Sequence, residues 1–231
     1  MGSPGDFARG LAADAAADND PTGWFERLYS AAGTGDAVVP WHQNRPDPML
    51  VQWAGERSGD GRRAIVVGCG LGDDAEFVAG LGFATVAFDV APSAIDQARQ
   101  RFPDSTVDYR AADLLALPAG WRHAFDLVVE NFTVQSLPES LRHKATAAIA
   151  GLVAPDGTLI VHASVRREDA APRPGPPWPL RRADVEAFAV DGLLVHALAE
   201  IPEPDDPRYT VWRGEFRAVR HGGDDLGRYA S

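Results

Sequence analysis

A buried strand that runs directly into three alternating glycines constrains this chain more than any other feature. In the stretch Ala64-Ile-Val-Val-Gly-Cys-Gly-Leu-Gly-Asp73, the leading apolar and mostly β-branched residues are typical of a buried strand. Gly68, Gly70 and Gly72 then break it, and glycine lets a backbone touch a ligand because it has no Cβ. Asp73 is a good N-cap for the apolar run that follows. A strand, a glycine turn and a helix start predict the entry corner of a nucleotide-type site in an open α/β sheet.

The spacing of the glycines indicates the ligand. A dinucleotide fingerprint, Gly-x-Gly-x-x-Gly, needs its third glycine at position 73, which is Asp73. A carboxylate at the helix N-terminus opposes the charge of a pyrophosphate bound there. It favours a ligand that has no phosphate and carries a positive sulfonium, and S-adenosylmethionine is such a ligand. The alternative is a plain structural turn, because Gly-x-Gly-x-Gly also occurs in ordinary turns.

Length, charge and cysteine content exclude several classes of protein. The 231 residues suffice for one full α/β domain and are few for two. The formal charge of −11 disfavours nucleic acid as a partner and favours a neutral or cationic small molecule, although acidity can also serve solubility alone. The chain has neither a long apolar run nor a basic-then-apolar start, so we expect no membrane span and no secretory signal. The single cysteine excludes an internal disulfide and fits a cytoplasmic location.

Alternating strand and helix patterns after Ala64 predict a mostly parallel sheet with helices on both faces. Strands are expected at 64–67, 85–89, 107–110, 125–129 and 158–164, followed by an antiparallel pair at 193–201 and 210–219. Helices are expected near 24–29, 73–81, 92–102, 139–152 and 182–190, and one begins at Asp47-Pro48.

The remaining segments set the domain boundaries. Residues 1–20 are rich in small and polar residues, so we expect a flexible segment with weak helicity at 11–17. Residues 21–231 are expected to form a single domain, with 21–60 as a helical cap over the site. Pro155-Asp-Gly157 predicts a tight turn before the fifth strand, and 172–179 a proline-rich loop.

Acidic side chains end two of the predicted strands. Asp89 lies at the end of the second strand, where a carboxylate can accept both hydroxyls of a ribose, with Val90 beside it in the same site. Its alternative role is to cap the helix that starts at Pro92. Asp113 follows the third strand and can accept from an adenine amino group while Leu114 packs on the ring. Its alternative role is to form a turn.

Polar residues also follow the fourth strand, at the edge where open α/β sheets place ligands. Glu130 can face the ammonium group of the ligand, and Asn131 and Phe132 can border the substrate. All three can equally be helix-start residues.

No residue stands out as a catalytic nucleophile or a metal ligand. Cys69 lies between two glycines and is expected to pack as a small apolar group. There is no Gly-x-Ser-x-Gly elbow of a hydrolase. The histidines show no metal spacing; they are His42, His123, His143, His162, His196 and His221. We therefore assign no catalytic residue and no metal.

The glycine turn with Asp89 and Asp113 resembles class I S-adenosylmethionine-dependent methyltransferases. Three further segments resemble the thiopurine S-methyltransferase-like family within that class. They are Trp24-Phe-Glu-Arg-Leu-Tyr29, Pro40-Trp-His-Gln43 and Arg173-Pro-Gly-Pro-Pro-Trp-Pro-Leu180. The resemblance covers about residues 22–219 and implies a Rossmann-like α/β fold with a seven-stranded, mostly parallel sheet and an antiparallel C-terminal strand.

By this resemblance, two tryptophans cover the cofactor, and the glycine turn and acidic strand ends hold it. The expected cofactor contacts are Trp24, Trp41, Gly68, Gly70, Gly72, Asp89, Val90, Asp113, Leu114 and Glu130. The N-terminal segment and the proline-rich loop enclose the methyl acceptor, with His42, Gln43, Asn131, Phe132 and Trp178 as expected contacts. The family often has arginine where this chain has Asn131, which suggests a less anionic acceptor than a thiopurine. Val66 stands where many class I members carry an acidic residue.

The expected activity is methyl transfer from S-adenosylmethionine to a small molecule, leaving S-adenosylhomocysteine. Sulfur is the favoured acceptor atom, because an aromatic thiol is largely ionised near neutral pH and needs no general base. An alcohol acceptor would need a base, a role open to His42 if it faces the site. The alternatives are an O- or N-methyltransferase of a secondary metabolite, a non-catalytic adenosine-ligand-binding protein or a nicotinamide-dependent oxidoreductase. The chain is expected to be a monomer or a homodimer.

Overall fold

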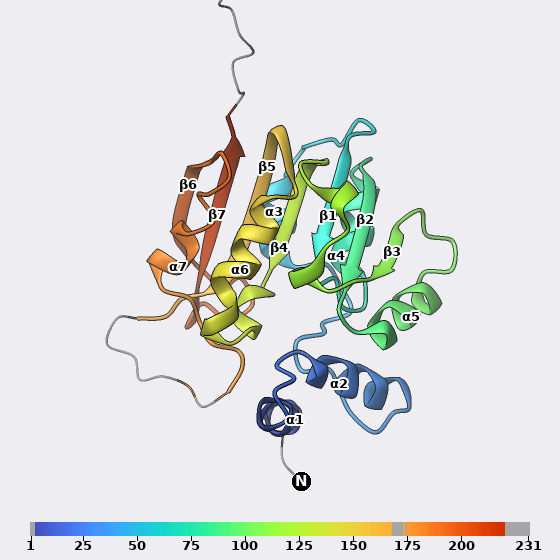
Figure 1. The fold of residues 1–231 in the computed structure, drawn as a ribbon. Coiled ribbons are helices and arrows are strands. Elements are labelled where there is room, and N and C mark those ends of the chain that lie inside the picture. The colour runs from blue at the N-terminus through green and yellow to red at the C-terminus, as the bar shows by residue number, and fades with distance from the viewer. Residues whose placement is uncertain (1–2, 168–172, 174, 220–231) are drawn as a thin grey trace, which may run out of the picture.

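Seven strands form one sheet in the order β3-β2-β1-β4-β5-β7-β6 (Figure 1). The computed structural model describes residues 3–167, 173 and 175–219. The strands are β1 (Arg63–Val67), β2 (Ala84–Asp89), β3 (Asp108–Ala111), β4 (Phe125–Asn131), β5 (Val153–Ser164), β6 (Leu193–Pro202) and β7 (Thr210–Ala218). Strands β1 to β5 pair in parallel, whereas β7 runs antiparallel to both β5 and β6. The predicted fold class is confirmed.

Helices cover both faces of this sheet. They are α1 (Pro4–Ala17), α2 (Gly23–Gly33), α3 (Pro48–Ala54), α4 (Asp73–Gly80), α5 (Pro92–Arg101), α6 (Glu139–Ala150) and α7 (Arg182–Glu186), with single 3-10 turns η1 (Leu114–Ala116), η2 (Ala119–Trp121) and η3 (Val134–Ser136). Alternation along β1 directs Ile65 into the core under α6 and α7, and Val66 into the core under α3, α4 and α5. Both cores are apolar, so the sheet is fixed from both sides.

The strand order reverses between β1 and β4. From β1 the chain crosses to β2 on one side, whereas β4 lies on the other side. Connections that leave two adjacent parallel strands in opposite directions open a crevice at their carboxyl ends, which is where open α/β sheets bind ligands. The glycine turn follows β1 directly, so it lies at this crevice.

The N-terminal stretch is more helical than expected, because helix α1 covers residues 4–17, whereas only weak helicity at 11–17 was predicted. Ser3 and Asp6 make a capping box, in which the Ser3 side chain accepts from the Asp6 amide and the Asp6 carboxylate accepts from the Ser3 amide. The small side chains of Ala8, Ala12 and Ala15 pack against the buried residues of α2. Strong helix propensity of alanine and the capping box are the signals that the composition argument missed.

Three local predictions are corrected. Helix α4 has Gly72, not Asp73, as its N-cap residue; Gly72 adopts φ 93° and makes no side-chain cap. The segment Pro155–Gly157 lies inside β5, which begins at Val153, instead of before it; the register with β4 shifts there, and Asp156 has φ 63°. Helix α7 ends at Glu186, short of residue 190. Pro172 and Pro174 of the expected loop, and His221, lie outside the described residues.

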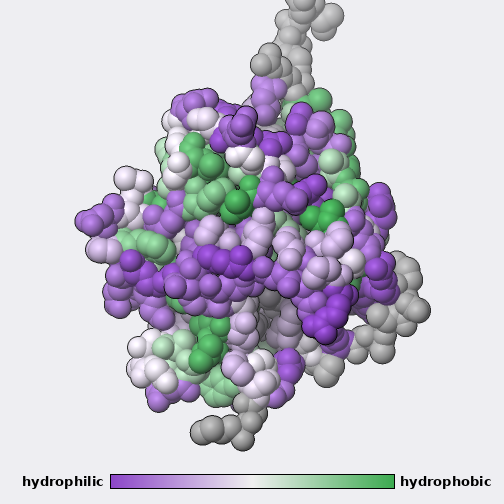
Figure 2. Space-filling view, turned by 180° about the vertical axis from the view of Figure 1, so that it is seen from behind, coloured by the Kyte–Doolittle hydropathy of each residue, from purple (hydrophilic) through white to green (hydrophobic). Residues whose placement is uncertain are grey.

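Figure 2 shows the molecule from the side opposite to that of Figure 1. Hydrophilic residues form a band across the middle of this face, and hydrophobic residues lie in separate groups above and below the band. Scattered exposed apolar residues are normal on protein surfaces. In the described part of the chain, no helix is long and apolar enough to cross a membrane.

Candidate functional site

A cavity of about 830 Å³ opens at the carboxyl edge of the sheet. This volume lies in the upper part of the range for small-molecule sites. Its wall includes the glycine turn, the ends of β2 and β4, and the segments before α3 and between β6 and β7. The predicted site residues on the wall are Trp24, Trp41, His42, Gln43, Gly68, Gly70, Asp89, Val90, Asp113, Leu114, Asn131 and Phe132. The fold therefore brings twelve of the fifteen predicted contacts to one cavity.

Three predicted contacts do not line this cavity. Gly72 is buried behind the turn, against the Tyr109 hydroxyl. Glu130 is fully buried and accepts a hydrogen bond from the Val134 amide at 2.7 Å, because alternation along β4 turns it away from the face of Asn131. The Trp178 indole donates to the Arg173 carbonyl at 3.1 Å, within its own loop. The position of Glu130 follows from strand geometry, which a motif match does not encode.

Asp89 joins the end of β2 to the glycine turn. Its carboxylate accepts from the Gly70 amide at 3.0 Å and from the Ala91 amide at 2.9 Å. The side chain is 6% exposed, and burial raises its pKa to about 6. A carboxylate has about four acceptor positions, so two remain for a ligand at the cavity wall. Asp89 does not cap α5, its alternative role, because Ala91 is the N-cap residue and no side chain caps this helix.

Asp113 lies at the same edge, after β3. Its Oδ1 accepts from the Leu115 amide at 2.8 Å, so the side chain does form a turn, its alternative role. No other bond to its carboxylate comes from the described residues, and the side chain is exposed at the cavity wall. Leu114 and Val90 lie on the same wall. This part of the cavity therefore fits a flat apolar ring that carries a hydrogen-bond donor at its edge.

Four aromatic side chains, the aromatic cluster, line the cavity: Trp24, Phe25, Tyr29 and Trp41. Tyr29 among them lies against Gly70 of the glycine turn. The Trp24 and Trp41 rings are 5.9 Å apart between centroids and nearly perpendicular. The Trp41 indole donates to the Tyr29 hydroxyl at 3.1 Å. Trp24 is buried, whereas Trp41 is 47% exposed. Phe25 and Tyr29 were not predicted as contacts, although they lie four residues apart on the helix and so share a face with the cavity.

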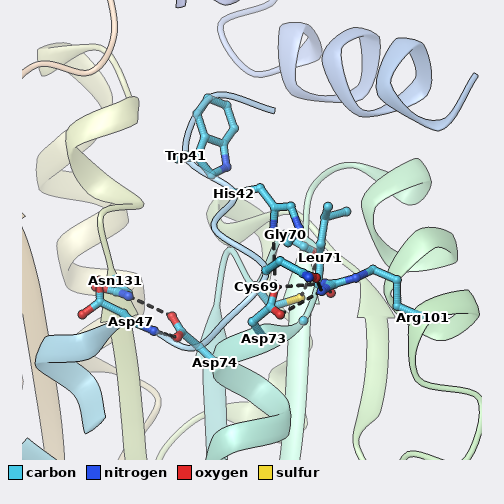
Figure 3. A network of polar contacts seen from close by, with 12 residues as sticks. Trp41, His42, Asp47, Cys69, Gly70, Leu71, Asp73, Asp74, Arg101 and Asn131 are labelled. Atoms are coloured by element: carbon cyan, nitrogen blue, oxygen red, sulfur yellow. Dashed lines mark hydrogen bonds and ion pairs between the residues drawn. The ribbon is translucent and has the colours of Figure 1, made fainter. Parts of the chain in front are cut away.

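Asp74 and Asp47 approach Asn131 at the β4 end of the cavity (Figure 3). The Asp74 carboxylate accepts from the Asn131 side-chain amide and from the Asp47 backbone amide, both at 2.8 Å. Burial raises the pKa of Asp74 to about 6. The Asn131 Oδ1 atom is buried and has no partner among the described residues. This end of the cavity therefore offers hydrogen-bond acceptors and suits a donor-rich cationic group.

Asp73 is held by an arginine, which corrects one argument from the sequence. The Arg101 guanidinium donates to both Asp73 oxygens at 2.8 and 2.9 Å and to Asn44 at 2.7 Å, and it also contacts the Leu71 carbonyl (Figure 3). The negative charge of Asp73 is thus matched, so its repulsion of a pyrophosphate no longer excludes a dinucleotide. Arg101 was missed because its partners lie about 30 and 57 residues away in the sequence.

His42 lies on the cavity wall beside the same pair. Its Nδ1 is 3.4 Å from an Asp73 oxygen. Burial lowers the pKa of His42, Asp73 opposes this shift, and Arg101 adds to it. The imidazole is therefore mainly neutral near pH 7. No group of three or more potential metal ligands occurs in the parts of the chain that the structure describes.

The residues present fit S-adenosylmethionine. Asp89 has acceptor positions left for two hydroxyl groups. The buried Asn131 Oδ1 has no partner among the described residues and can accept a hydrogen bond from an ammonium group. The aromatic cluster can cover a sulfonium by cation–π attraction. Gly70 has φ 51°, and a Cβ there would lie 2.8 Å from the Tyr29 hydroxyl, so this part of the turn must be glycine.

Comparison with known proteins agrees with this geometry. Residues 64–157 match a family model described as a methyltransferase domain. Thiocyanate methyltransferase 1 of Brassica oleracea is 26% identical over 198 residues, which covers 84% of this chain and 80% of that protein. The ubiquinone biosynthesis O-methyltransferase of Xanthomonas campestris is 34% identical over 113 residues, covering 48% of this chain and 46% of that protein.

Solved structures share the fold. The structure of the N-methyltransferase NodS of Bradyrhizobium japonicum with S-adenosyl-L-homocysteine superposes with a TM-score of 0.62 at 19% identity, covering 84% of this chain and 96% of that one. A structure concerned with conversion of a disulfide bond into a thioacetal group during echinomycin biosynthesis gives a TM-score of 0.65 at 24% identity, covering 86% and 94%.

Proposed function

We propose that this chain, which is a class I S-adenosylmethionine-dependent methyltransferase, methylates the sulfur of a small thiol. The similarity to a thiocyanate methyltransferase carries the choice of sulfur. It spans 198 residues, whereas the methyltransferase family model matches only residues 64–157, so it extends well beyond the cofactor-binding core.

The described side chains suit such a transfer. The bound cofactor supplies a methyl group already activated on a sulfonium sulfur. Asp89 orients the sugar, Asn131 and Asp74 orient the amino-acid end, and the aromatic cluster shields the reacting atoms from water. A thiol that is ionised near neutral pH attacks without a proton acceptor from the protein. Binding and alignment are then the chain's main contributions.

We further propose membership of the thiopurine S-methyltransferase-like family, with residues 21–60 as a cap. Two of the three segments that resemble this family contribute Trp24, Trp41, His42 and Gln43 to the cavity wall. The third contributes prolines, including Pro176 and Pro177. The segments that carry the resemblance are therefore those around the expected acceptor.

O-methylation is the second candidate, and His42 favours it. This imidazole lies on the cavity wall, its pKa is lowered, and Asp73 can stabilise the imidazolium formed when it accepts a proton. A phenol acceptor needs such a base. One matched relative, the ubiquinone biosynthesis protein, has a name that states O-methylation.

Labelled S-adenosylmethionine with equal concentrations of thiols, phenols and amines separates the two candidates. We expect thioethers as products, formed at a rate that His42→Ala leaves within about twofold. If the products are instead phenol methyl ethers, and His42→Ala abolishes their formation, the activity is O-methylation and not S-methylation. Absence of any thioether across the thiol panel would refute the proposal.

Trp41→Ala is expected to weaken S-adenosylmethionine binding about fivefold, in line with a cation–π contribution of about 1 kcal/mol. Because Trp41 is 47% exposed, the melting temperature should stay within a few degrees. Calorimetric titration measures the affinity, and Trp178→Ala, off the cavity wall, is the matched control. Unfolding of Trp41→Ala would instead mean that this tryptophan is part of the core.

A further inference from the structure

Five arginines, the arginine rim, line the cavity away from the sheet although the whole chain has a formal charge of −11. They are Arg9, Arg45, Arg167, Arg173 and Arg208. They come from α1, the segment before α3, the segment after β5, the proline-rich loop and the β6–β7 connection. The acidic residues at the strand ends and glycine turn belong to the part of the wall assigned to the cofactor. The cavity is thus acidic at the sheet and mainly basic around the acceptor.

Four of the five arginines of the arginine rim form ion pairs with carboxylates that lie outside the cavity. Arg9 pairs with Asp6 at 2.5 Å, Arg167 with Glu200 at 2.6 Å, and Arg208 with Asp206 at 2.5 Å, while Arg45 contacts Asp205. None of these four carboxylates lines the cavity. A guanidinium has five N–H donors, and one carboxylate uses about two of them. Each of these arginines therefore keeps donors for a ligand.

Arg173 differs from the others, because no ion pair joins it to a carboxylate of the described residues. Its loop meets α1: a Cβ built on Gly175 would lie 3.5 Å from Arg9 Cγ. Arg9 and Arg173 thus approach the cavity from adjoining segments. Glu203 is the one acidic residue of the β6–β7 connection on the wall, and it accepts from the Asp206 amide at 2.6 Å.

We infer that the methyl acceptor carries a carboxylate in addition to its thiol, and that Arg173 and Arg9 bind this carboxylate. The sulfur in this statement rests on the proposed function, whereas the carboxylate rests on the arginine rim. Guanidinium groups bind carboxylates by paired, charge-assisted hydrogen bonds. The inference reverses the expectation of a less anionic acceptor, which relied on Asn131 alone. Cations from other segments supply the charge that position 131 lacks.

Two aromatic thiols that differ by one carboxylate test this inference: thiophenol and 4-mercaptobenzoate. We expect the carboxylated thiol to have a kcat/KM about tenfold higher, the size of one exposed charge-assisted contact. Arg173→Gln combined with Arg9→Gln should raise KM about tenfold for the carboxylated thiol and leave thiophenol unchanged. Raising the salt concentration should weaken the carboxylated thiol more than thiophenol, because both are thiolates near neutral pH and only the former has a second charge at exposed arginines, where salt screens it.

Arg110→Gln is the matched control, since Arg110 is exposed, pairs with Asp108 at 2.7 Å and does not line the cavity. It should change neither substrate. Equal kcat/KM for the two thiols, or equal losses for both in the double variant, would overturn the inference. Calorimetric binding of both thiols to the protein saturated with S-adenosylhomocysteine separates the two proposals. Tighter binding of the carboxylated thiol without thioether formation would refute S-methylation and retain the carboxylate site.

Discussion

Asp89→Ala is expected to weaken binding of S-adenosylhomocysteine by about 10- to 100-fold. This corresponds to roughly 1–3 kcal/mol, the cost of leaving buried polar groups without partners. The carboxylate is 6% exposed, accepts from the Gly70 and Ala91 amides and retains acceptor positions at the cavity wall. Its removal takes away the ribose contact and loosens the glycine turn together. Calorimetric titration of the folded variant measures the loss.

The pH dependence of the same affinity provides a second readout. Burial raises the pKa of Asp89 to about 6, so the free protein loses this anionic acceptor as the pH falls through 6. Affinity of the natural chain should decline below pH 6, and that of Asp89→Asn should not follow the same curve. Asp113→Ala is the comparison, with a smaller loss because this side chain is exposed. Unchanged affinity of Asp89→Ala would exclude the ribose role.

Glu130→Gln is expected to gain stability relative to the natural chain as the pH rises. Glu130 is fully buried, and burial raises its pKa from 4.5 to about 7. The charge is favoured more in the unfolded chain, so the carboxylate lowers the free energy of unfolding as the pH rises from 4.5 to 7. One unit of pKa shift is about 1.4 kcal/mol, which gives roughly 3 kcal/mol across this window. Below pH 4.5 the cost is absent.

Urea unfolding at pH 4.5 and pH 8 measures this difference. The advantage of Glu130→Gln over the natural chain should grow by roughly 2–3 kcal/mol between the two pH values. Comparing the change between pH values cancels the constant cost of burying the extra amide. Glu139→Gln, at an exposed carboxylate of α6, is the control and should show no such growth. A pH-independent difference would mean that the pKa of Glu130 is the same in the folded and the unfolded chain.

Most of the sheet could be predicted from the sequence because its strands are short apolar runs bounded by glycine, proline and acidic residues. Strands β1 to β4 begin and end within two residues of the predicted positions. The prediction at Pro155–Gly157 was right about a local irregularity and wrong about the strand start, because β5 already pairs with β4 at Val153 and resumes at Thr158 after a shift in register. Helix α1 was underestimated, with only weak helicity predicted at 11–17, because alanines were counted as weakly apolar instead of strongly helix-forming.

The candidate site could also be predicted only in part from the sequence. Residues at strand ends, such as Asp89 and Asn131, could be found because parallel strands place their carboxyl ends at one edge. Glu130 was misplaced since the next residue along a strand faces the opposite side. Arg101 and the arginine rim could not be found, because their neighbours in space are remote in sequence. Long-range pairing leaves no local pattern.

Arg101 also bears on how such a protein can change its specificity. Through one guanidinium it fastens Asn44, in the segment before α3, to the glycine turn. The same outer segments also pack on the sheet domain through a small apolar cluster, in which Tyr29 and Val39 contact Ala91 and Ala94. Under the proposed function, exchange of those outer segments would change the methyl acceptor while the glycine turn and the strand ends stay as they are.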